Sequence, residues 1–255
     1  MAREISQVWD GLLHDLSARR WAARARRTEA ASLASLKAEV TRARTLARHL
    51  DKVISLAESR LAQPRIGSTT IGLPPGTDWS CRPDLWRLPL PRHGIAATPA
   101  QTRLGDHATL YHNCPLDEIL MRQIRNQDPV DLAPFGVSLE VFGFTGSFLS
   151  LAIDLPPSAG EGLRQRHIFR AEIHAELERP AAMFARLNIR HGPNTEQVVQ
   201  AILPEDRIVD FDLSGSDINE KRVEGVWLDI IVDRPAMNRI LLRDVTVARY
   251  PRADM

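Results

Sequence analysis

Two segments near the C-terminus decide the fold: VWLDIIVD at residues 226–233 and ILLRDVTVAR at residues 240–249. In the first segment, apolar side chains alternate with others, Val226, Leu228, Ile230 and Val232 on one side and Trp227, Asp229 and Asp233 on the other. Alternation with a period of two places successive side chains on opposite faces of a strand. Each segment is therefore predicted to be a β-strand with one face on a hydrophobic core.

The same alternation extends back from these strands to Pro134. We expect strands near 137–141, 149–155, 169–177, 183–190, 198–203 and 208–213, with Thr145-Gly146 as a hairpin turn between the first two. Short strands at regular spacing, with no helices between them, indicate an antiparallel β-sandwich of the jelly-roll type. The predicted fold class is mainly β, with an N-terminal α extension that forms a long coiled-coil-like helix.

Three parts are predicted along the chain. Residues 1–63 form the amphipathic helix, residues 64–102 form a proline-rich strap, and residues 103–255 form the sandwich. The strap holds apolar residues, unlike a flexible linker, so we expect it to be ordered with Trp79 and Trp86 buried against the sandwich. Residues 116–124 have the spacing of a short helix, and a strand is the alternative.

The N-terminal segment carries a heptad seam. Apolar residues follow one another at alternating steps of three and four: Leu33, Leu36, Val40, Ala43, Ala47, Leu50, Ile54, Ala57 and Leu61. Such a seam needs a partner surface, so we expect self-association or a partner helix through Leu33, Leu36, Val40, Leu50, Ile54 and Leu61. The seam changes phase near Ala30, where the helix either continues or folds back.

Residues 8–27 allow a second interpretation. They combine Trp9, Leu12, Leu16 and Trp21 with a cluster of arginines, the composition of a helix lying on a membrane surface, although Asp10 and Asp15 oppose this. Nucleic-acid binding through the same arginines is not favoured, because no stacking aromatics or known module accompany them. Peripheral membrane association is therefore kept as the alternative to a helical partner.

The closing strand resembles a known fold family. Its pattern, an apolar run followed by Arg243-Asp244-Val245-Thr246-Val247, is similar to the last strand of galactose-binding-like jelly rolls, the fold of many carbohydrate-binding modules. Arg243 stands where those modules often have a first aspartate. The whole chain, with Gly76-Thr77-Asp78-Trp79, Pro134-Phe135-Gly136 and His191-Gly192-Pro193-Asn194, also resembles a bacterial family of unknown function. The first resemblance implies a sandwich and a structural calcium at Asp244; the second implies no activity.

Composition limits the class of protein. The chain is 44% hydrophobic and 25% charged with a net charge of +1, which is ordinary for a globular protein. Basic residues exceed acidic ones in residues 1–63, and the reverse holds in residues 134–255. Two cysteines cannot build a disulfide framework, and we see neither a bilayer-spanning run nor a secretory signal, so cytoplasmic residence is expected.

The sequence offers few candidates for catalytic or metal-binding motifs. Cys81, His93, His112 and Cys114 include zinc-ligand types, but they lack the paired spacing of zinc sites, so packing and loop roles are expected. No nucleophile elbow or phosphate loop is present. Glu172 and Glu176 are expected to pair with Arg186 and Arg190 across a hairpin. We therefore predict no catalytic residues and no cofactor, apart from calcium at Asp244.

The remaining polar side chains suggest a binding face. Arginine, asparagine and an indole are the groups with which proteins recognise sugars or carboxylates. The candidate ligand-binding residues are Arg170, His174, Arg186, Asn188, Arg190, Trp227 and Asp229. The leading hypothesis is a non-enzymatic jelly-roll module, with carbohydrate as one ligand, carried on an oligomerising helix. The alternatives are a glycan-active enzyme using Glu172, His174 or Asp229, and an assembly scaffold without a small ligand.

Overall fold

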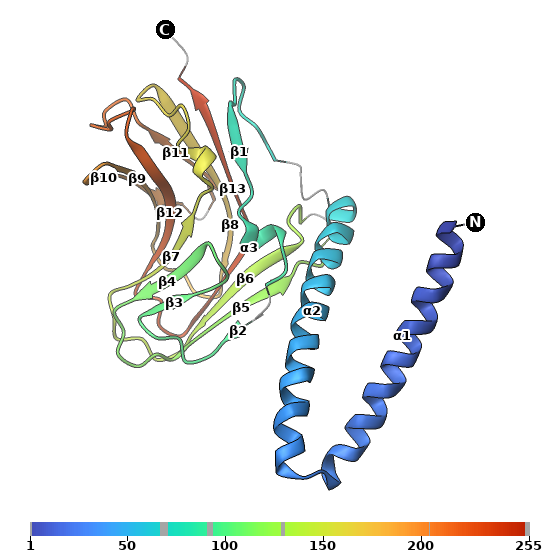
Figure 1. Ribbon diagram of the computed structural model, residues 1–255. Coiled ribbons are helices and arrows are strands. Elements are labelled where there is room, and N and C mark those ends of the chain that lie inside the picture. The colour runs from blue at the N-terminus through green and yellow to red at the C-terminus, as the bar shows by residue number, and fades with distance from the viewer. Residues whose placement is uncertain (1, 67–70, 91–93, 129–130, 204, 253–255) are drawn as a thin grey trace. The chain divides into compact units, whose positions relative to one another are not determined.

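A computed structural model describes residues 2–66, 71–90, 94–128, 131–203 and 205–252 (Figure 1). The chain divides into two compact units, Met1–Val53 and Ile54–Met255, which are described separately. The side chains of residues 2–14, 51–52, 55–56 and 58–66, and the whole of His93, lie outside the described residues, and with them the predictions for Trp9, Leu12, Leu61 and His93.

The N-terminal segment forms two helices rather than one. Helix α1 (Ala2–Arg27) is followed by the 3₁₀ turn η1 (Thr28–Ala30), and helix α2 (Leu33–Ile66) begins after a break. Ala31 is extended, and Ser32 caps α2 by accepting a hydrogen bond from the backbone N–H of Ser35 at 3.4 Å. Of the two alternatives left open near Ala30, a continuous helix and an interrupted one, the structure has the interrupted one, and the break lies at the predicted change of phase. Neither described helix has an apolar stretch sufficient to cross a bilayer.

The rest of the chain is an antiparallel β-sandwich, as predicted. Among the described residues, one sheet has seven strands: β1 (Trp79–Cys81), β2 (Gly94–Ile95), β5 (Ile119–Arg125), β6 (Phe135–Val141), β8 (His167–Leu177), β11 (Ile208–Asp212) and β13 (Asn238–Pro251). The other has six: β3 (Gln101–Arg103), β4 (Ala108–His112), β7 (Phe148–Asp154), β9 (Met183–His191), β10 (Asn194–Ile202) and β12 (Val223–Asp233). The orders are β11-β8-β13-β6-β5-β2, with β1 beside β13, and β10-β9-β12-β7-β4-β3.

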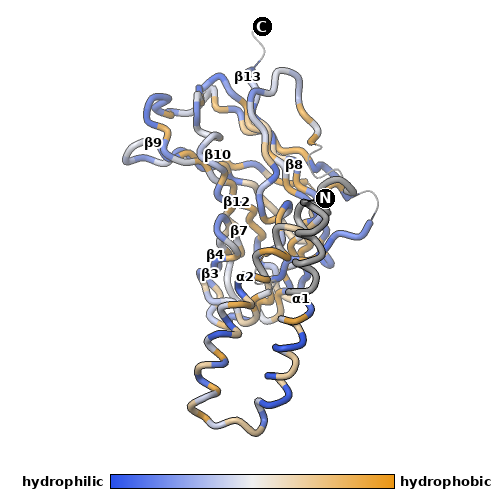
Figure 2. The backbone as a smooth tube through the Cα atoms, turned by 45° about the vertical axis from the view of Figure 1, so that its right-hand side comes forward, coloured by the Kyte–Doolittle hydropathy of each residue, from blue (hydrophilic) through white to orange (hydrophobic). Residues whose placement is uncertain are grey.

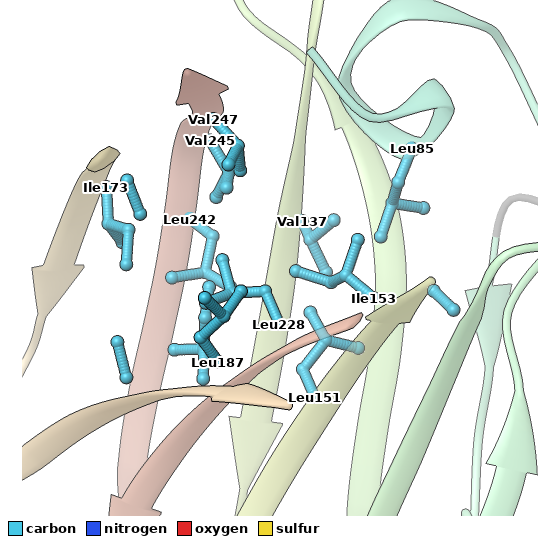
Figure 3. Close-up of a cluster of buried hydrophobic side chains, with 14 of the residues drawn as sticks. Leu85, Val137, Leu151, Ile153, Ile173, Leu187, Leu228, Leu242, Val245 and Val247 are labelled. Atoms are coloured by element: carbon cyan, nitrogen blue, oxygen red, sulfur yellow. The ribbon is translucent and has the colours of Figure 1, made fainter. Parts of the chain in front are cut away.

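The core lies between the two sheets. Figure 3 shows Leu151, Leu187 and Leu228 of the six-stranded sheet meeting Val137, Leu242 and Val245 of the other. These side chains come from the inward positions of the alternating pattern, and all are buried. Figure 2 shows the matching hydrophobic segments along β7, β8 and β12.

The short elements of the strap, residues 64–102, add to this core. Helix α3 (Asp84–Arg87) places Leu85 against Val137 and Ile153 (Figure 3) and buries Trp86, as predicted. The indole N–H of Trp86 donates to the carbonyl of Leu242 at 3.0 Å. Trp79 is only half-buried; it lies edge-on to Phe169 and donates to the Ser158 hydroxyl at 3.0 Å.

Several predicted pairings were wrong because successive strands change sheets. Strands β6 and β7 lie in different sheets, so Thr145-Gly146 belongs to a crossing loop instead of a hairpin turn. A Cβ atom at Gly146 would come within 2.5 Å of the Asn113 side chain, so glycine is needed here for close packing. Residues 116–124 contribute to strand β5, the alternative to the expected helix, because Ile119, Met121 and Gln123 are buried at alternate positions. The helix η2 (Pro157–Ala159) lies in the loop after β7.

Candidate functional site

The seven predicted ligand-binding residues are divided between the two sheets. Arg170 and His174 lie on β8 in the seven-stranded sheet, whereas Arg186, Asn188, Arg190, Trp227 and Asp229 lie on β9 and β12 in the six-stranded sheet. The expectation that β8 and β9 are neighbours was wrong, because residues 178–182 carry the chain from one sheet to the other. Outward side chains on different sheets point away from each other, so they cannot contact one small ligand.

Strand register brings the second group together. Trp227 of β12 stands opposite Asn188 of β9 on one side and Asp154 of β7 on the other. Two residues further, Asp229 stands opposite Arg186 and Ala152. Residues in register on one face have side chains within reach of each other. The outer face of the six-stranded sheet is therefore the candidate site.

The centre of this face is a buried polar cluster. Asp229 is 3% exposed, and its Oδ2 accepts hydrogen bonds from Arg186 Nε at 2.8 Å and from Asn188 Nδ2 at 2.9 Å. Asn188 is fully buried, and its Oδ1 accepts from Gln197 Nε2 at 3.1 Å. A buried charge must be paired and hydrogen-bonded to be tolerated. These contacts hold the Arg186 guanidinium in a fixed position at the surface.

A hollow of about 660 Å³ adjoins the cluster. Besides Arg186, Arg190, Trp227 and Asp229, its walls include residues for which the sequence predicted no role: Gln101, Arg103, Thr109, Tyr111, Phe148, Ser150, Ala152 and Asp154. Register explains the depression, because Thr109 and Ala152 are adjacent and Tyr111 stands opposite Ser150. Small side chains in the middle of the face form the floor, and larger ones border it.

The aromatic borders of the hollow come from three strands. Tyr111 on β4 and Phe148 on β7 are exposed, and Trp227 on β12 is half-buried. Tyr111 points outward because it alternates with Leu110 and His112, which are both buried. Residues 103–113 were predicted to begin the sandwich, but neither their sheet nor their outward face could be deduced.

Arg190 is at the rim, where it is exposed. Its Nε lies 3.4 Å from a carboxylate oxygen of Glu224, also exposed. Exposed pairs of this kind are weak, so the Arg190 guanidinium can exchange one partner for another. The predicted pairing of Arg186 and Arg190 with Glu172 and Glu176 is wrong, because the two glutamates lie on β8 in the other sheet.

Arg170 and His174 are occupied by neighbours on the seven-stranded sheet. Arg170 donates to both carboxylate oxygens of Asp210 at 2.7 and 2.6 Å and lies 5.5 Å from the centre of the Tyr250 ring. The Asp210 carboxylate raises the pKa of Arg170 above its ordinary value. His174 Nε2 is 2.8 Å from Glu172 Oε1. The Arg170–Asp210 pair joins β8 to β11, whereas the His174–Glu172 contact lies within β8.

The proposed acid–base set of a glycan-active enzyme does not come together. Glu172 and His174 lie on the seven-stranded sheet, and Asp229 lies on the six-stranded sheet with its Oδ2 held by Arg186. A glycosidase needs two carboxyl groups about 5–9.5 Å apart on either side of the bond to be cleaved. These three residues therefore cannot share one cleft.

The side chains predicted as candidate metal ligands are bonded to other groups in the structure. Both oxygens of Asp244 accept hydrogen bonds from Arg82, so calcium would have to displace a guanidinium. A bulge at Arg243 places its Nε 2.9 Å from Glu176 Oε1, on the same side of the sheet as Asp244. His112 is hydrogen-bonded to the carbonyl of Thr98 at 2.9 Å. Within the described part of the chain, no three His, Cys, Asp or Glu side chains group as metal ligands.

Comparison with protein families shows what the chain is related to. Residues 1–255 match a family described as a family of unknown function, DUF6478. The chain belongs to this family. The likeness to an uncharacterised family is thus confirmed, and no curated protein matches the sequence.

Solved structures with a similar fold share little sequence with the chain. The xylan-binding CBM22-1 domain of Paenibacillus barcinonensis Xyn10C is 11% identical, with a TM-score of 0.34 over 63% of this chain and 94% of that one. The family 11 carbohydrate-binding module of Clostridium thermocellum, in complex with a β-1,3-1,4-mixed-linked tetrasaccharide, is 8% identical, with a TM-score of 0.35 over 64% and 97%.

A third similar structure is an enzymatic domain. The enzymatically active domain of tailspike protein 4 from Bacteriophage CBA120 is 7% identical, with a TM-score of 0.39 over 55% of this chain. The match spans only 19% of the tailspike chain.

Proposed function

We propose that the sandwich binds a carbohydrate chain, without chemical conversion, on the outer face of the six-stranded sheet. One observation carries the proposal: Tyr111, Phe148 and Trp227 border a floor of small residues beside the fixed Arg186–Asp229 pair. Aromatic side chains offer flat apolar surfaces, and Tyr and Trp add a polar end. Sugar rings have apolar faces that such surfaces can cover.

The polar groups of the hollow suit the hydroxyl groups of a sugar. Hydroxyl groups both donate and accept, and the walls present the donors of Gln101 and Arg190 together with the carboxylate of Asp154. The volume, about 660 Å³, falls within the usual range of small-ligand sites, roughly 300–1,000 Å³. Because the hollow lies on an open sheet face, it favours a chain of several sugars over an enclosed single sugar.

The test is a glycan array with the full chain, followed by calorimetry on the best ligand. Trp227→Ala is expected to weaken binding by at least about tenfold, a loss of about 1.4 kcal/mol. Phe142→Ala is the matched control, because Phe142 is 50% exposed but lies outside the hollow. Thermal unfolding of both variants shows whether the sandwich remains folded.

Two results would overturn the proposal. The first is the absence of any glycan ligand, which would favour the assembly scaffold. The second is a folded Trp227→Ala variant that binds the ligand as tightly as the unmodified chain. Release of shortened sugars during the assay would instead support a glycan-active enzyme.

A further inference from the structure

Helix α2 carries an apolar stripe, and most of the large side chains described on it are exposed. The helix runs from Leu33 to Ile66 without interruption, so the heptad seam keeps one phase along it. On this stripe Leu33 is 82% exposed, Leu50 is 52% exposed and Ile54 is 53% exposed. A row of exposed large apolar residues on a soluble helix is costly unless another surface covers it.

The charged residues along one edge of the stripe change sign from one end of the helix to the other. With Leu33 at heptad position a, the e positions are Lys37, Arg44, Asp51 and Glu58. The first half of this edge is basic and the second half is acidic. Charges at e and g positions of a coiled coil decide partner and orientation, so this edge predicts how a second helix would lie.

We propose that α2 pairs with α2 of a second copy of this chain in antiparallel orientation, symmetric about the Arg48–His49 step. In an antiparallel pair, e positions face e positions. Lys37 then faces Glu58 of the partner subunit, and Arg44 faces Asp51 of the partner subunit. The twofold axis repeats each pair, so all e-position charges have partners of opposite sign.

The apolar layers favour the same arrangement. Antiparallel pairing sets each seam alanine against a larger residue: Ala47 meets Leu50 of the partner subunit, and Ala43 meets Ile54 of the partner subunit. The g positions bring Leu46 to Val53 of the partner subunit. Alternation of large and small residues across the seam fills space without voids.

A parallel pair of helices would be less favourable both in apolar packing and in charge pairing. Each seam residue would face its own copy, so Ala43, Ala47 and Ala57 would form three undersized layers. Voids of this kind destabilise an interface. Along the edge, Arg60 would face Arg65 of the partner subunit, and only Glu39 with Arg44 would give an attractive pair. In the single chain Glu39 lies 3.6 Å from Arg24 of α1, so its charge already has a neighbour.

The paired segment is long enough to be stable. Residues 33–61 form four heptads and about 42 Å of helix at ~1.5 Å per residue. The interface lies along α2 and uses none of the residues of the six-stranded sheet. Glycan binding and helix pairing can therefore fail independently of each other.

The experiment is sedimentation velocity on the full chain over a range of concentrations. A concentration-dependent dimer is expected. Arg44→Asp places like charges opposite each other twice per dimer and is expected to raise the dimer Kd by about tenfold or more. Asp51→Arg should have the same effect, and the double variant should restore the original Kd. Arg48→Asp, an equal charge change at a position off the seam, should leave the Kd unchanged.

A second pair of charge-swapping substitutions distinguishes the antiparallel from the parallel orientation. The double variant Glu39→Arg with Arg44→Glu would restore the dimer only if the helices were parallel; in the antiparallel pair it should remain weak. Circular dichroism checks that each variant keeps its helix. A strictly monomeric chain at every concentration would overturn the proposal, as would restoration by this second exchange in place of the first.

Discussion

The guanidinium of Arg82 in the strap donates to both carboxylate oxygens of Asp244 on β13, at 2.8 and 2.9 Å. Both side chains are buried, and they are separated by most of the sandwich sequence. The contact joins the strap to the closing strand, next to the three residues of β1 that pair with Val247, Ala248 and Arg249. The strap is thus attached to the sandwich by an ion pair as well as by backbone pairing.

Removing one member of this pair is expected to be costly. Arg82→Ala leaves a buried carboxylate without its cation, and breaking a buried pair costs about 3–5 kcal/mol of the free energy of unfolding. Arg122→Ala is the control, because the Arg122–Glu140 pair is partly exposed and such pairs contribute about 0–1 kcal/mol. Urea denaturation measures both. Equal losses in the two variants would contradict this explanation.

Calcium is expected to have no effect on stability. A cation bound to the folded protein at a hundred times its Kd would add about 2.7 kcal/mol. The Arg82 guanidinium already takes both oxygens of Asp244, so a calcium ion would have to break this pair before it could bind. Thermal unfolding with EDTA and then with excess CaCl₂ checks this. A clear rise of Tm with calcium, absent in Asp244→Asn, would show that the metal site exists.

The two tryptophans of the strap should differ in importance. Trp86 is fully buried, so Trp86→Ala is expected to destabilise the sandwich by about 3–5 kcal/mol, the usual cost of emptying a large aromatic site. Trp79 is half-buried, so Trp79→Ala should cost less. Chemical denaturation of the two variants provides the comparison. A larger loss at Trp79 would show that its contacts with Phe169 and Ser158 matter more than burial.

The alternation of side chains predicted well where the strands lie, but it did not predict which strands are neighbours in a sheet. The pattern in residues 169–177 and 183–190 correctly located β8 and β9, because burial of every second side chain is a local property. Whether a loop turns back into the same sheet or crosses to the other depends on contacts between distant residues. Residues 178–182 carry no local signal of the crossing, and for this reason Arg170 was wrongly placed beside Arg186.

The candidate site was predictable in part for the same reason. Arg186, Asn188 and Arg190 share one face because they alternate on a single strand, and the sequence shows this directly. That Trp227 and Asp229 lie beside them follows from the pairing of β12 with β9, which only the structure reveals. Tyr111 and Phe148 complete the hollow from β4 and β7, and nothing near them in sequence indicates this role.

A histidine under the strap should make stability depend on pH. His167 is buried; its Nδ1 accepts a hydrogen bond from the backbone N–H of Arg164 at 3.0 Å, and its Nε2 lies 3.3 Å from Asp78. A nitrogen that accepts a hydrogen bond carries no proton, so the ring is neutral. Burial lowers the pKa of His167 below its ordinary value, and nearby arginines, Arg249 first among them, act in the same direction, against the opposing effect of Asp78.

The direction of the pH effect follows from the lowered pKa. Below the ordinary histidine pKa of about 6.5, the unfolded chain binds a proton that the folded chain does not, so stability falls as pH falls. His167→Gln keeps a neutral side chain that can donate to Asp78 but does not titrate. Urea denaturation between pH 7.5 and about pH 5 should therefore show a smaller loss of stability in this variant than in the unmodified chain. The other histidines titrate in both proteins, so the difference isolates His167; parallel curves would mean that its pKa is the same in the folded and unfolded chains.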